Sequence, residues 1–497
     1  MALAISALKY DYVSIQNPNS ENSSIDLTNH LVQTEYFEDL LSPVITMQMQ
    51  IRSEFNYVSN VPIRGGEMIA FSANVGGKQL KFGDLDKKGN IIPNTGELYV
   101  YKLSDLSTPS QAQDFTLHIT TLEFIKNETS RCQKKFKPLS IDKHVKNILT
   151  DVMKVNPDKV LTKNIEESLN TYTFIGNNRK PFYTINWLCP KAVGKSKTPS
   201  AKGVSGIETN SGSNNAQGKG TAGFLFYENQ EGFNFKSIES LVSSTKLDNN
   251  EKKSVFSYVY KGKGSTGNPY NLDENTNINF YYLSKSTDVR KALTVGQYGS
   301  LTIFYDSLNQ TFSQIEYRLE KEIDSKLGSD DDLSTPKVQD KKLHEYNSRL
   351  YSRISDHGAL GVGEKGLEAS GRDPVDQAKS ISRYNALFSQ SLNIQVPCNT
   401  NLKVGDIINV TFPELKMGKS EDSDPSMSGN YLISRLNHHM QLNASFTSLN
   451  LIRDSHGESS AYPVDTMQSG SIIDESGDQV IPTNYKDDSI PNLPYLK

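Results

Sequence analysis

Residues 390–453, near the C-terminus, constrain the fold more than any other stretch of this chain. They contain four runs of strand-type residues, at 392–396, 406–412, 431–436 and 445–453. In the second run Ile408, Val410 and Phe412 occupy alternate positions, which is typical of a strand with one buried face. Turn-forming residues at 398–401 and around Gly405 separate the runs. The stretch therefore predicts a small antiparallel β unit.

A second strand-rich region spans residues 31–125. Ile45, Met47, Met49 and Ile51 fall on one face of a predicted strand, while Thr46, Gln48, Gln50 and Arg52 fall on the other. Further alternating runs occur at 68–75, 99–103 and 115–119. After 119 the apolar pattern shifts phase to Leu122 and Phe124, and we expect a β-bulge there.

Residues 131–190 change from strand-type to helical spacing. Apolar residues from Ile141 to Met153 predict a helix, and a second short helix is expected after Pro181 and is stopped by Pro190. His144 lies beside the apolar stripe, so we expect a surface or flanking histidine. Trp187, the only tryptophan, is expected to pack within this small α/β unit.

Two glycine motifs suggest nucleotide binding, but neither has the required context. Gly194-Lys195-Ser196 lies in a loop at 191–222 that is rich in Gly, Ser, Lys and Asn, and the position of the first phosphate-loop glycine is Cys189. Gly361, Gly363 and Gly366 have dinucleotide-fingerprint spacing, but no buried strand precedes them and no helix pattern follows. We therefore expect no nucleotide cofactor.

A hairpin is predicted at 223–237, where aromatic runs flank a polar turn that contains Gly232. Glu228 and Glu231 in this turn have two interpretations. They can be paired carboxylates of a glycoside hydrolase, or turn and interface residues. We favour the second interpretation, because no pocket signal accompanies them.

The rest of the chain alternates between strand-like and polar stretches. Residues 254–312 contain strand-like runs, and 313–389 are predicted to be helical or irregular, with a helix starting at Asp373-Pro374. His438 and His439 point to opposite strand faces, so they are not expected to share a metal. Residues 455–497 carry apolar islands between prolines, which fits either a strap that becomes ordered on a partner or a disordered end.

Composition excludes several classes of protein. The net charge is −4 and the pI about 6.1, which gives no global basic signal for nucleic-acid binding. The three cysteines are far apart in the sequence, which argues against a disulfide framework and suits a reducing cytoplasm. The apolar run at 2–8 is expected to be an ordered first segment rather than a signal peptide, and no run approaches the roughly 20 apolar residues of a membrane anchor.

The order of pieces in 390–453 resembles the C-terminal tube domain of phage tail hub proteins. These are the central baseplate hubs of contractile-tailed bacteriophages, whose fold recurs at the base of type VI secretion spikes. The family's opening also looks similar, because Tyr36-Phe37-Glu38 precedes Ser42-Pro43, and its aromatic hairpin resembles the one at 223–237. The hub family has characteristic positions in this C-terminal pattern. In this chain they are occupied by Leu402, Gly405, Asp406, Gly429, Tyr431, Ile433, Thr447, Leu449 and Arg453.

The resemblance implies a mainly β (α+β) chain with two tail-tube-like β-barrel domains and a smaller α/β insertion. The expected division is a first tube-like domain at 1–130 and an α/β insertion at 131–250 with a flexible loop at 191–222. The second tube-like domain is then built from 251–312 and 390–454, with a helical or irregular insertion at 313–389. An extended tail occupies 455–497.

The resemblance also implies a structural virion protein of the tail baseplate hub, assembled in the host cytoplasm. Three copies would form a pseudo-hexameric ring between the tail tube protein and the central spike protein, through which the genome passes. The tape measure protein and baseplate wedge proteins are further expected partners. We expect no enzymatic activity, no catalytic residue, no cofactor, no metal and no specific nucleic-acid binding.

Two other classes of protein remain open at this point. A tail-associated cell-wall hydrolase would need a catalytic glutamate in a compact helical domain, or a Cys/His pair in a pocket. A carbohydrate-binding tail module would show an exposed aromatic platform and form no ring.

Overall fold

The chain has 497 residues and forms two compact units, 1–458 and 459–497. A computed structural model describes residues 8–17, 24–55, 57, 63–75, 79–109, 112–194, 222–242, 256–260, 276–285, 288–306, 310–319, 327, 337–354, 373–413, 424, 426–442, 444–455, 472–473 and 479–480. In the second unit, β26 (Ile472–Ile473) pairs antiparallel with β27 (Gln479–Val480).

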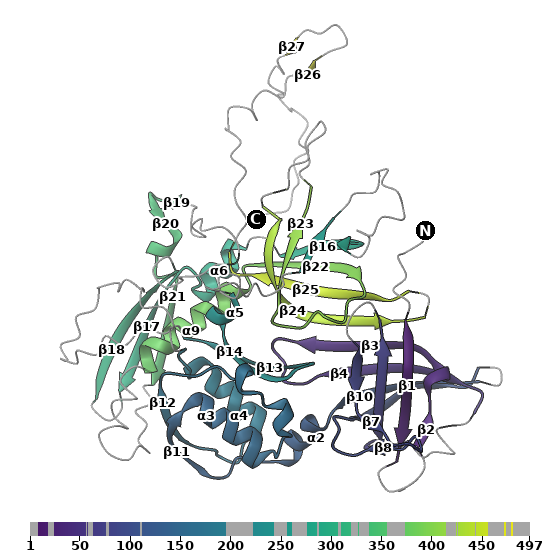
Figure 1. Cartoon of the computed structure of the whole chain (residues 1–497). Helices are drawn as coiled ribbons and strands as arrows, with labels where there is room; N and C mark the ends of the chain where they lie inside the picture. The colour runs from purple at the N-terminus through teal and green to yellow at the C-terminus, as the bar shows by residue number, and fades with distance from the viewer. Residues whose placement is uncertain are drawn as a thin grey trace, which may run out of the picture. The chain divides into compact units, whose positions relative to one another are not determined.

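Fourteen strands of the first unit form one large sheet (Figure 1). Its main path runs β16-β22-β25-β24-β3-β4-β10-β9-β5-β1-β2, with β15, β23 and β6 attached beside it. The prediction of a mainly β chain is confirmed. The strands are β1 (Lys9–Gln16), β2 (Ser24–Asp26), β3 (Leu31–Asp39), β4 (Thr46–Ser53), β5 (Met68–Asn74), β6 (Leu80–Phe82), β9 (Leu98–Ser107), β10 (Gln113–Thr121), β15 (Phe256–Val259), β16 (Phe280–Lys285), β22 (Gln390–Pro397), β23 (Ile407–Thr411), β24 (Gly429–Met440) and β25 (Phe446–Arg453).

The strands of the first region and of the C-terminal stretch meet at the pair β3–β24. This antiparallel ladder runs from Arg435 opposite Asp39 to Met440 opposite Thr34. The inward side chains of both strand groups contribute to one buried hydrophobic cluster, which includes Tyr36 and Leu436. The two groups expected as separate barrels therefore share one sheet, and the pairing of the described strands follows an open path.

The α/β unit has a hydrophobic core of its own, built by aromatic residues such as Phe136 and Phe233. The helix predicted from Ile141, the helix that starts at Pro181 and the aromatic hairpin are all confirmed. The elements are α2 (Leu122–Thr129), β11 (Lys135–Ser140), α3 (Ile141–Asn147), a π-helical turn (Ile148–Val152), the 3₁₀ turns Pro157–Lys159 and Thr162–Asn164, β12 (Thr171–Ile175), α4 (Pro181–Leu188), the 3₁₀ turn Cys189–Lys191, β13 (Phe224–Asn229), β14 (Gly232–Ser237) and α5 (Ile238–Val242).

A three-stranded sheet, β18-β17-β21, lies between the hairpin and the C-terminal strands in sequence. The helix predicted after Asp373 is confirmed as α9 and leads directly into β22. The elements of this part are α6 (Val289–Val295), β17 (Gly299–Asp306), β18 (Thr311–Arg318), β19 (Lys337–Val338), β20 (Lys341–Lys342), the 3₁₀ turn Leu343–Glu345, β21 (Arg349–Ile354) and α9 (Asp373–Leu387). Three short elements of the first region complete the set: β7 (Asp84–Leu85), β8 (Ile91–Ile92) and the 3₁₀ turn Thr28–His30.

Two local predictions are wrong. The phase shift at Leu122 and Phe124 is not a β-bulge, because β10 ends at Thr121 and helix α2 begins there, so the apolar spacing changes from that of a strand to that of a helix. The stretch 313–389 is not only helical or irregular, since it contains most of β18 and all of β21. Their polar composition reflects side chains that are mostly exposed in a small sheet.

In the α/β unit, His144 is more buried than expected and Trp187 is more exposed. His144 is fully buried, with Nε2 2.8 Å from the carbonyl oxygen of Tyr172, so the surface position was wrong. Trp187 makes edge contacts with Tyr172 and Phe174, as the packing prediction required, yet 37% of it stays exposed. Residues 195–221, the glycine motif at 361–366 and most of the tail after 455 lie outside the described residues.

Candidate functional site

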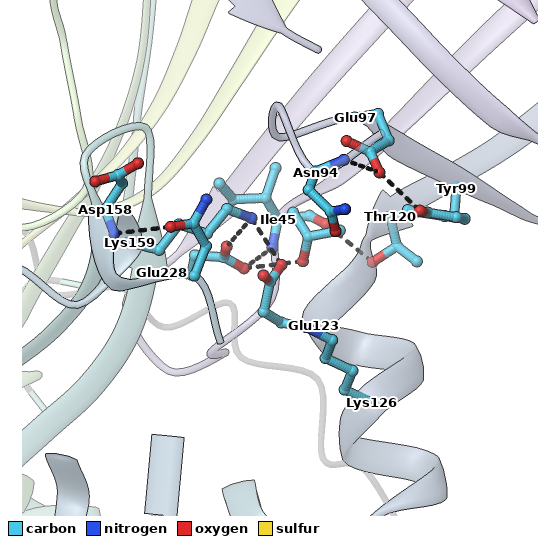
Figure 2. Close-up of polar contacts among 12 residues, drawn as sticks. Ile45, Asn94, Glu97, Tyr99, Thr120, Glu123, Lys126, Asp158, Lys159 and Glu228 are labelled. Atoms are coloured by element: carbon cyan, nitrogen blue, oxygen red, sulfur yellow. Dashed lines mark hydrogen bonds and ion pairs between the residues drawn. The ribbon is translucent and has the colours of Figure 1, made fainter. Parts of the chain in front are cut away.

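The two glutamates considered as paired carboxylates have different surroundings. Glu228 is 1% exposed, and its Oε2 accepts a hydrogen bond from the backbone N–H of Ile45 at 3.4 Å (Figure 2). The same oxygen accepts from the Thr121 hydroxyl at 3.1 Å. Glu231 instead forms an ion pair with Lys403 at 2.6 Å and lies 3.7 Å from Lys163. Glu228 thus acts as an acceptor in the core, and Glu231 as an ion-pair partner nearer the surface.

A lysine balances the buried carboxylate of Glu228 (Figure 2). Lys159 Nζ lies 3.5 Å from Glu228 Oε1 and 2.7 Å from Glu123 Oε2. Burial raises the pKa of Glu228, while the charge of Lys159 opposes this rise. Burial acts to lower the pKa of Lys159, but the two carboxylates together raise it. The three side chains attach the 3₁₀ turn Pro157–Lys159 to β13 and α2.

A second buried carboxylate, Glu38, joins three distant parts of the chain. Its Oε1 accepts hydrogen bonds from the Tyr36 hydroxyl at 2.7 Å and from the backbone N–H of Gln230 at 2.9 Å. Its Oε2 accepts from the backbone N–H of Val404 at 2.9 Å. Burial raises the pKa of Glu38 to about 7, although all three donors favour the ionised form. Glu38 therefore positions the hairpin turn and the loop before β23 against β3.

The side chains of β3, β4, β22, β24 and β25 that point away from the core form one surface, which we call the polar face. Where these strands carry the polar face, alternate residues are buried and those between them are intermediate or exposed. The alternation is lost at 431–434 of β24 and 451–453 of β25, where every residue is buried. The members are Gln33, Glu35, Phe37, Asp39, Thr46, Gln48, Gln50, Arg52, Ser391, Asn393, Gln395, Arg435, Asn437, His439, Ser448 and Asn450. A groove of about 730 Å³ runs over it and is lined by residues of these five strands, by Phe280 of β16 and by Ser42 and Val44.

The ionisable side chains of the polar face each lie beside a polar partner. Arg435 Nε lies 2.9 Å from Asp39 Oδ2 across the β3–β24 seam. Arg52 lies 2.7 Å from Asp114, which belongs to the neighbouring strand β10. His439 Nδ1 lies 3.3 Å from Glu35 Oε1. Both arginines of the polar face therefore have an aspartate beside them, and the face carries little net charge.

Uncharged amides and hydroxyls fill the positions between these pairs. Asn450 Nδ2 donates to Asn393 Oδ1 at 2.6 Å, and the Ser434 hydroxyl donates to Asn450 Oδ1 at the same distance. Gln33 Nε2 donates to Glu35 Oε1 at 2.7 Å. Such a surface can hydrogen-bond to water or to a passing polymer, but it does not offer a row of unpaired cations to a polyanion.

The sequence placed Thr46, Gln48, Gln50 and Arg52 on the outer side of their strand, and the structure confirms this. It did not show that Asn393, Asn437 and Asn450 belong to the same surface, because only the β3–β24 pairing brings the two strand groups together. A polar residue at every second position of 391–395, and again at Ser448 and Asn450, was the available signal.

The adjacent histidines point to opposite sides of β24, as predicted. His438 is fully buried, stacks on Tyr36 and has its pKa lowered to about 3 by burial, whereas His439 lies on the polar face. Within the described residues, no group of three His, Cys, Asp or Glu side chains could hold a metal ion. No helix in that same part of the chain has the length and apolarity needed to cross a membrane.

No protein-family model matches this chain, and no curated protein matches it. A tail protein from Neisseria meningitidis is similar in structure, with 11% identity and a TM-score of 0.47 over 89% of this chain and 96% of its own. The 43 kDa tail protein of prophage MuSo2 from Shewanella oneidensis has 9% identity and a TM-score of 0.43, over 89% and 98%. A type VI secretion component from E. coli has 9% identity and a TM-score of 0.38, over 90% and 78%.

Proposed function

We propose that this chain is a subunit of a tail hub, in which three copies form a ring with quasi-sixfold symmetry. The ring joins the tail tube to the central spike and lets the genome pass. The resemblance of 390–453 to the tube domain of hub proteins supports this function. The single observation that carries it is the polar face, which spans strands of both regions that the resemblance assigns to tube-like domains.

The polar face suits the wall of a passage for DNA. A lining of unpaired Lys and Arg would hold DNA through release of its counterions. The arginines of this face have carboxylate partners instead, and amides fill the intervening positions. We therefore assign the polar face to the lumen of the ring.

The open sheet suits assembly into a ring. Its described path begins at β16 and ends at β2, and strands at the ends of a sheet can pair with another chain. Phe280 and Tyr282 on β16 are both more than half exposed. In the proposed ring each copy contributes two tube-like domains, the first within 1–130 and the second within 251–312 and 390–454.

The proposal places the protein in the virion tail after assembly in the host cytoplasm. Its partners are the tail tube protein, the central spike protein, the tape measure protein and wedge proteins. The function is structural and without catalysis. The buried, lysine-paired state of Glu228 supports this, because such a carboxylate is not open to a substrate.

Mass photometry and chemical crosslinking of the purified chain, alone and with its spike partner, test the proposal. A trimer is the expected result. A chain that stays monomeric at assembly concentrations in both conditions contradicts it. Digestion of peptidoglycan by the purified protein, abolished by Glu228→Gln, would support the hydrolase alternative instead.

A further inference from the structure

The α/β unit has a charge opposite to that of the whole chain. Residues 131–191 contain twelve Lys and Arg against five Asp and Glu, while the full sequence has a net charge of −4. Two of the five acidic residues are turned inward. Asp142 accepts hydrogen bonds from Ser168, and Glu166 accepts from the side chains of Ser237 and Ser240. The positive excess of this unit therefore lies mainly at its surface.

One face of α4 combines this charge with exposed aromatic rings. Tyr183 and Trp187 are four residues apart, so they project from the same side of the helix, and they are 50% and 37% exposed. The exposed Arg179 guanidinium lies 4.5 Å from the centre of the Tyr183 ring. Lys191 is buried, and its Nζ lies 4.7 Å from the centre of the Trp187 ring and 4.9 Å from that of Tyr172, so it supports the strip from beneath. We call these four residues the basic aromatic strip.

Buried aromatic rings hold the strip in place. Trp187 packs edge-on against Tyr172 and Phe174, with ring centres 5.7 and 5.5 Å apart. Phe174 in turn stacks on Phe136 of β11 at 4.4 Å. A side chain held in this way loses little conformational entropy when a partner binds. The exposure of Trp187 is therefore a property of a rigid surface.

We propose that the basic aromatic strip docks an acidic, partly apolar segment of another protein. Trp, Tyr and Arg are the residue types that most often dominate the energy of protein–protein interfaces. A guanidinium stacked on an aromatic ring keeps its N–H edge available for bidentate binding to a carboxylate. The surplus of positive charge around the strip complements acidic side chains of the partner.

The geometry favours a protein partner over a carbohydrate or a nucleic acid. Sugars and unpaired bases stack on open aromatic faces. Here Arg179 lies over the Tyr183 ring and Lys191 over the Trp187 ring. Duplex DNA is held by cations that follow its backbone, whereas this strip exposes two aromatic rings and one cation, Arg179, since Lys191 is buried.

The full-length chain offers a direct readout, because Trp187 is its only tryptophan. The probe is a short synthetic peptide in which glutamates alternate with leucines, titrated while the emission of Trp187 is recorded. We expect a saturable change in emission that weakens as salt is added. Arg179→Glu and Tyr183→Ala are each expected to weaken binding by about tenfold or more, the size of effect found at interface hot spots.

Lys87→Glu is the matched control, because it makes the same change of charge at an exposed turn outside the α/β unit. It should bind the peptide like the wild type. The proposal is overturned if the peptide leaves Trp187 emission unchanged, or if Lys87→Glu weakens binding as much as Arg179→Glu. A stronger response to chito-oligosaccharides or single-stranded DNA, lost in Tyr183→Ala, also overturns it. Circular dichroism of each variant checks that the fold is retained, and the trimer test is independent of this result.

Discussion

Buried carboxylates hold together segments that are far apart in this chain. Glu38 receives hydrogen bonds from residues 230 and 404, and Glu228 from residues 45 and 121. Their oxygen atoms are used by donors of the protein itself. The energetic consequence is that each carboxylate stabilises a contact between loops, while its charge is costly to bury.

The first prediction concerns the pH dependence of stability at Glu38. Burial raises its pKa from the ordinary value of 4.5 to about 7 in the folded protein, so the folded state binds more protons than the unfolded chain between these values. Stability contributed by this group is therefore greatest at low pH and falls by about 3 kcal/mol as the pH rises through this window. Glu38→Gln removes the titrating group, and we expect a flatter dependence of the unfolding free energy on pH.

Urea denaturation at a series of pH values from 4.5 to about 8 measures this effect. Glu54→Gln, which changes an exposed glutamate, serves as the control and should leave the dependence unchanged. If the unfolding free energy changes with pH equally in the wild type and in Glu38→Gln, the buried carboxylate does not titrate in this window.

The second prediction concerns Gly405, one of the positions that carried the family resemblance. Its φ is +88°, and an added Cβ would lie 2.3 Å from the hydroxyl oxygen of the buried Tyr227. Gly89 has a similar φ of +84° but has nothing within 4 Å of such a Cβ. Alanine at either site incurs the cost of the left-handed backbone, but only Gly405→Ala also overpacks the core.

We expect Gly405→Ala to lose about 1–3 kcal/mol more unfolding free energy than Gly89→Ala. Thermal or urea denaturation of both variants measures the difference. Tyr227→Phe in the Gly405→Ala background should recover part of the loss, because it removes the clashing oxygen. Equal losses at the two glycines would mean that Tyr227 does not explain the requirement.

At the scale of the element, the strands of the large sheet separate two roles by alternation. One side of β22, β24 and β25 is apolar and packs into the core, and the other side carries amides, hydroxyls and paired charges. The polar side can therefore be changed without emptying the core. This makes the proposed lumen testable by surface substitutions.

The third prediction introduces unpaired cations on the polar face. Gln48→Lys, Gln395→Lys and Asn450→Lys together place three lysines along the groove of each chain. If the face lines the passage, the variant ring should retain DNA, with a salt dependence that steepens by about one unit for each phosphate that an added lysine neutralises. Electrophoretic mobility shifts over a range of salt concentrations measure this, and the wild type should bind little.

Three lysines on the small sheet β18-β17-β21 provide the charge-matched control, at the exposed positions Ser313, Gln314 and Ser352. The control should change DNA retention less than the variant of the polar face. Equal retention by the two variants would mean that added charge alone explains the effect. Strong, salt-sensitive DNA binding by the wild-type ring would contradict the assignment of the lumen.

At the scale of the whole molecule, the seam between β3 and β24 joins the first and last parts of the described sheet. Residues about 400 positions apart pair directly, as Glu35 does with His439. The core beneath the seam is shared by both strand groups. The sheet and core of the first unit therefore need strands from both its N-terminal and its C-terminal part. Residues 459–497 form a separate unit.

The fourth prediction concerns that second unit. Its sequence has apolar islands between prolines, which suits a strap that binds a partner. Because it is separate from the first unit, deletion of residues 460–497 should leave the trimer intact but weaken attachment of the spike. Mass photometry checks the first outcome and pull-down of the spike the second. Unchanged recovery of the spike would show that the tail is not a strap.

Local patterns in the sequence were sufficient for most individual elements. Alternation at 406–412 predicted β23, Pro181 and Asp373-Pro374 marked the starts of α4 and α9, and the glycine turn predicted the aromatic hairpin. These features depend on residues within one or two turns of each other, so their physical causes are visible in a short window. The outward position of Gln48 followed from the same periodicity.

Tertiary structure alone decided which elements meet. The polar face exists because β3 pairs with β24. Both carboxylate oxygens of Glu38 accept hydrogen bonds because two loops from distant regions present backbone N–H groups to them. His144 was misplaced for the same reason, since the rings that bury it come from β11 and β12. The burial of a side chain depends on what packs against it from elsewhere in the chain, and the periodicity of one element contains no information about that neighbour.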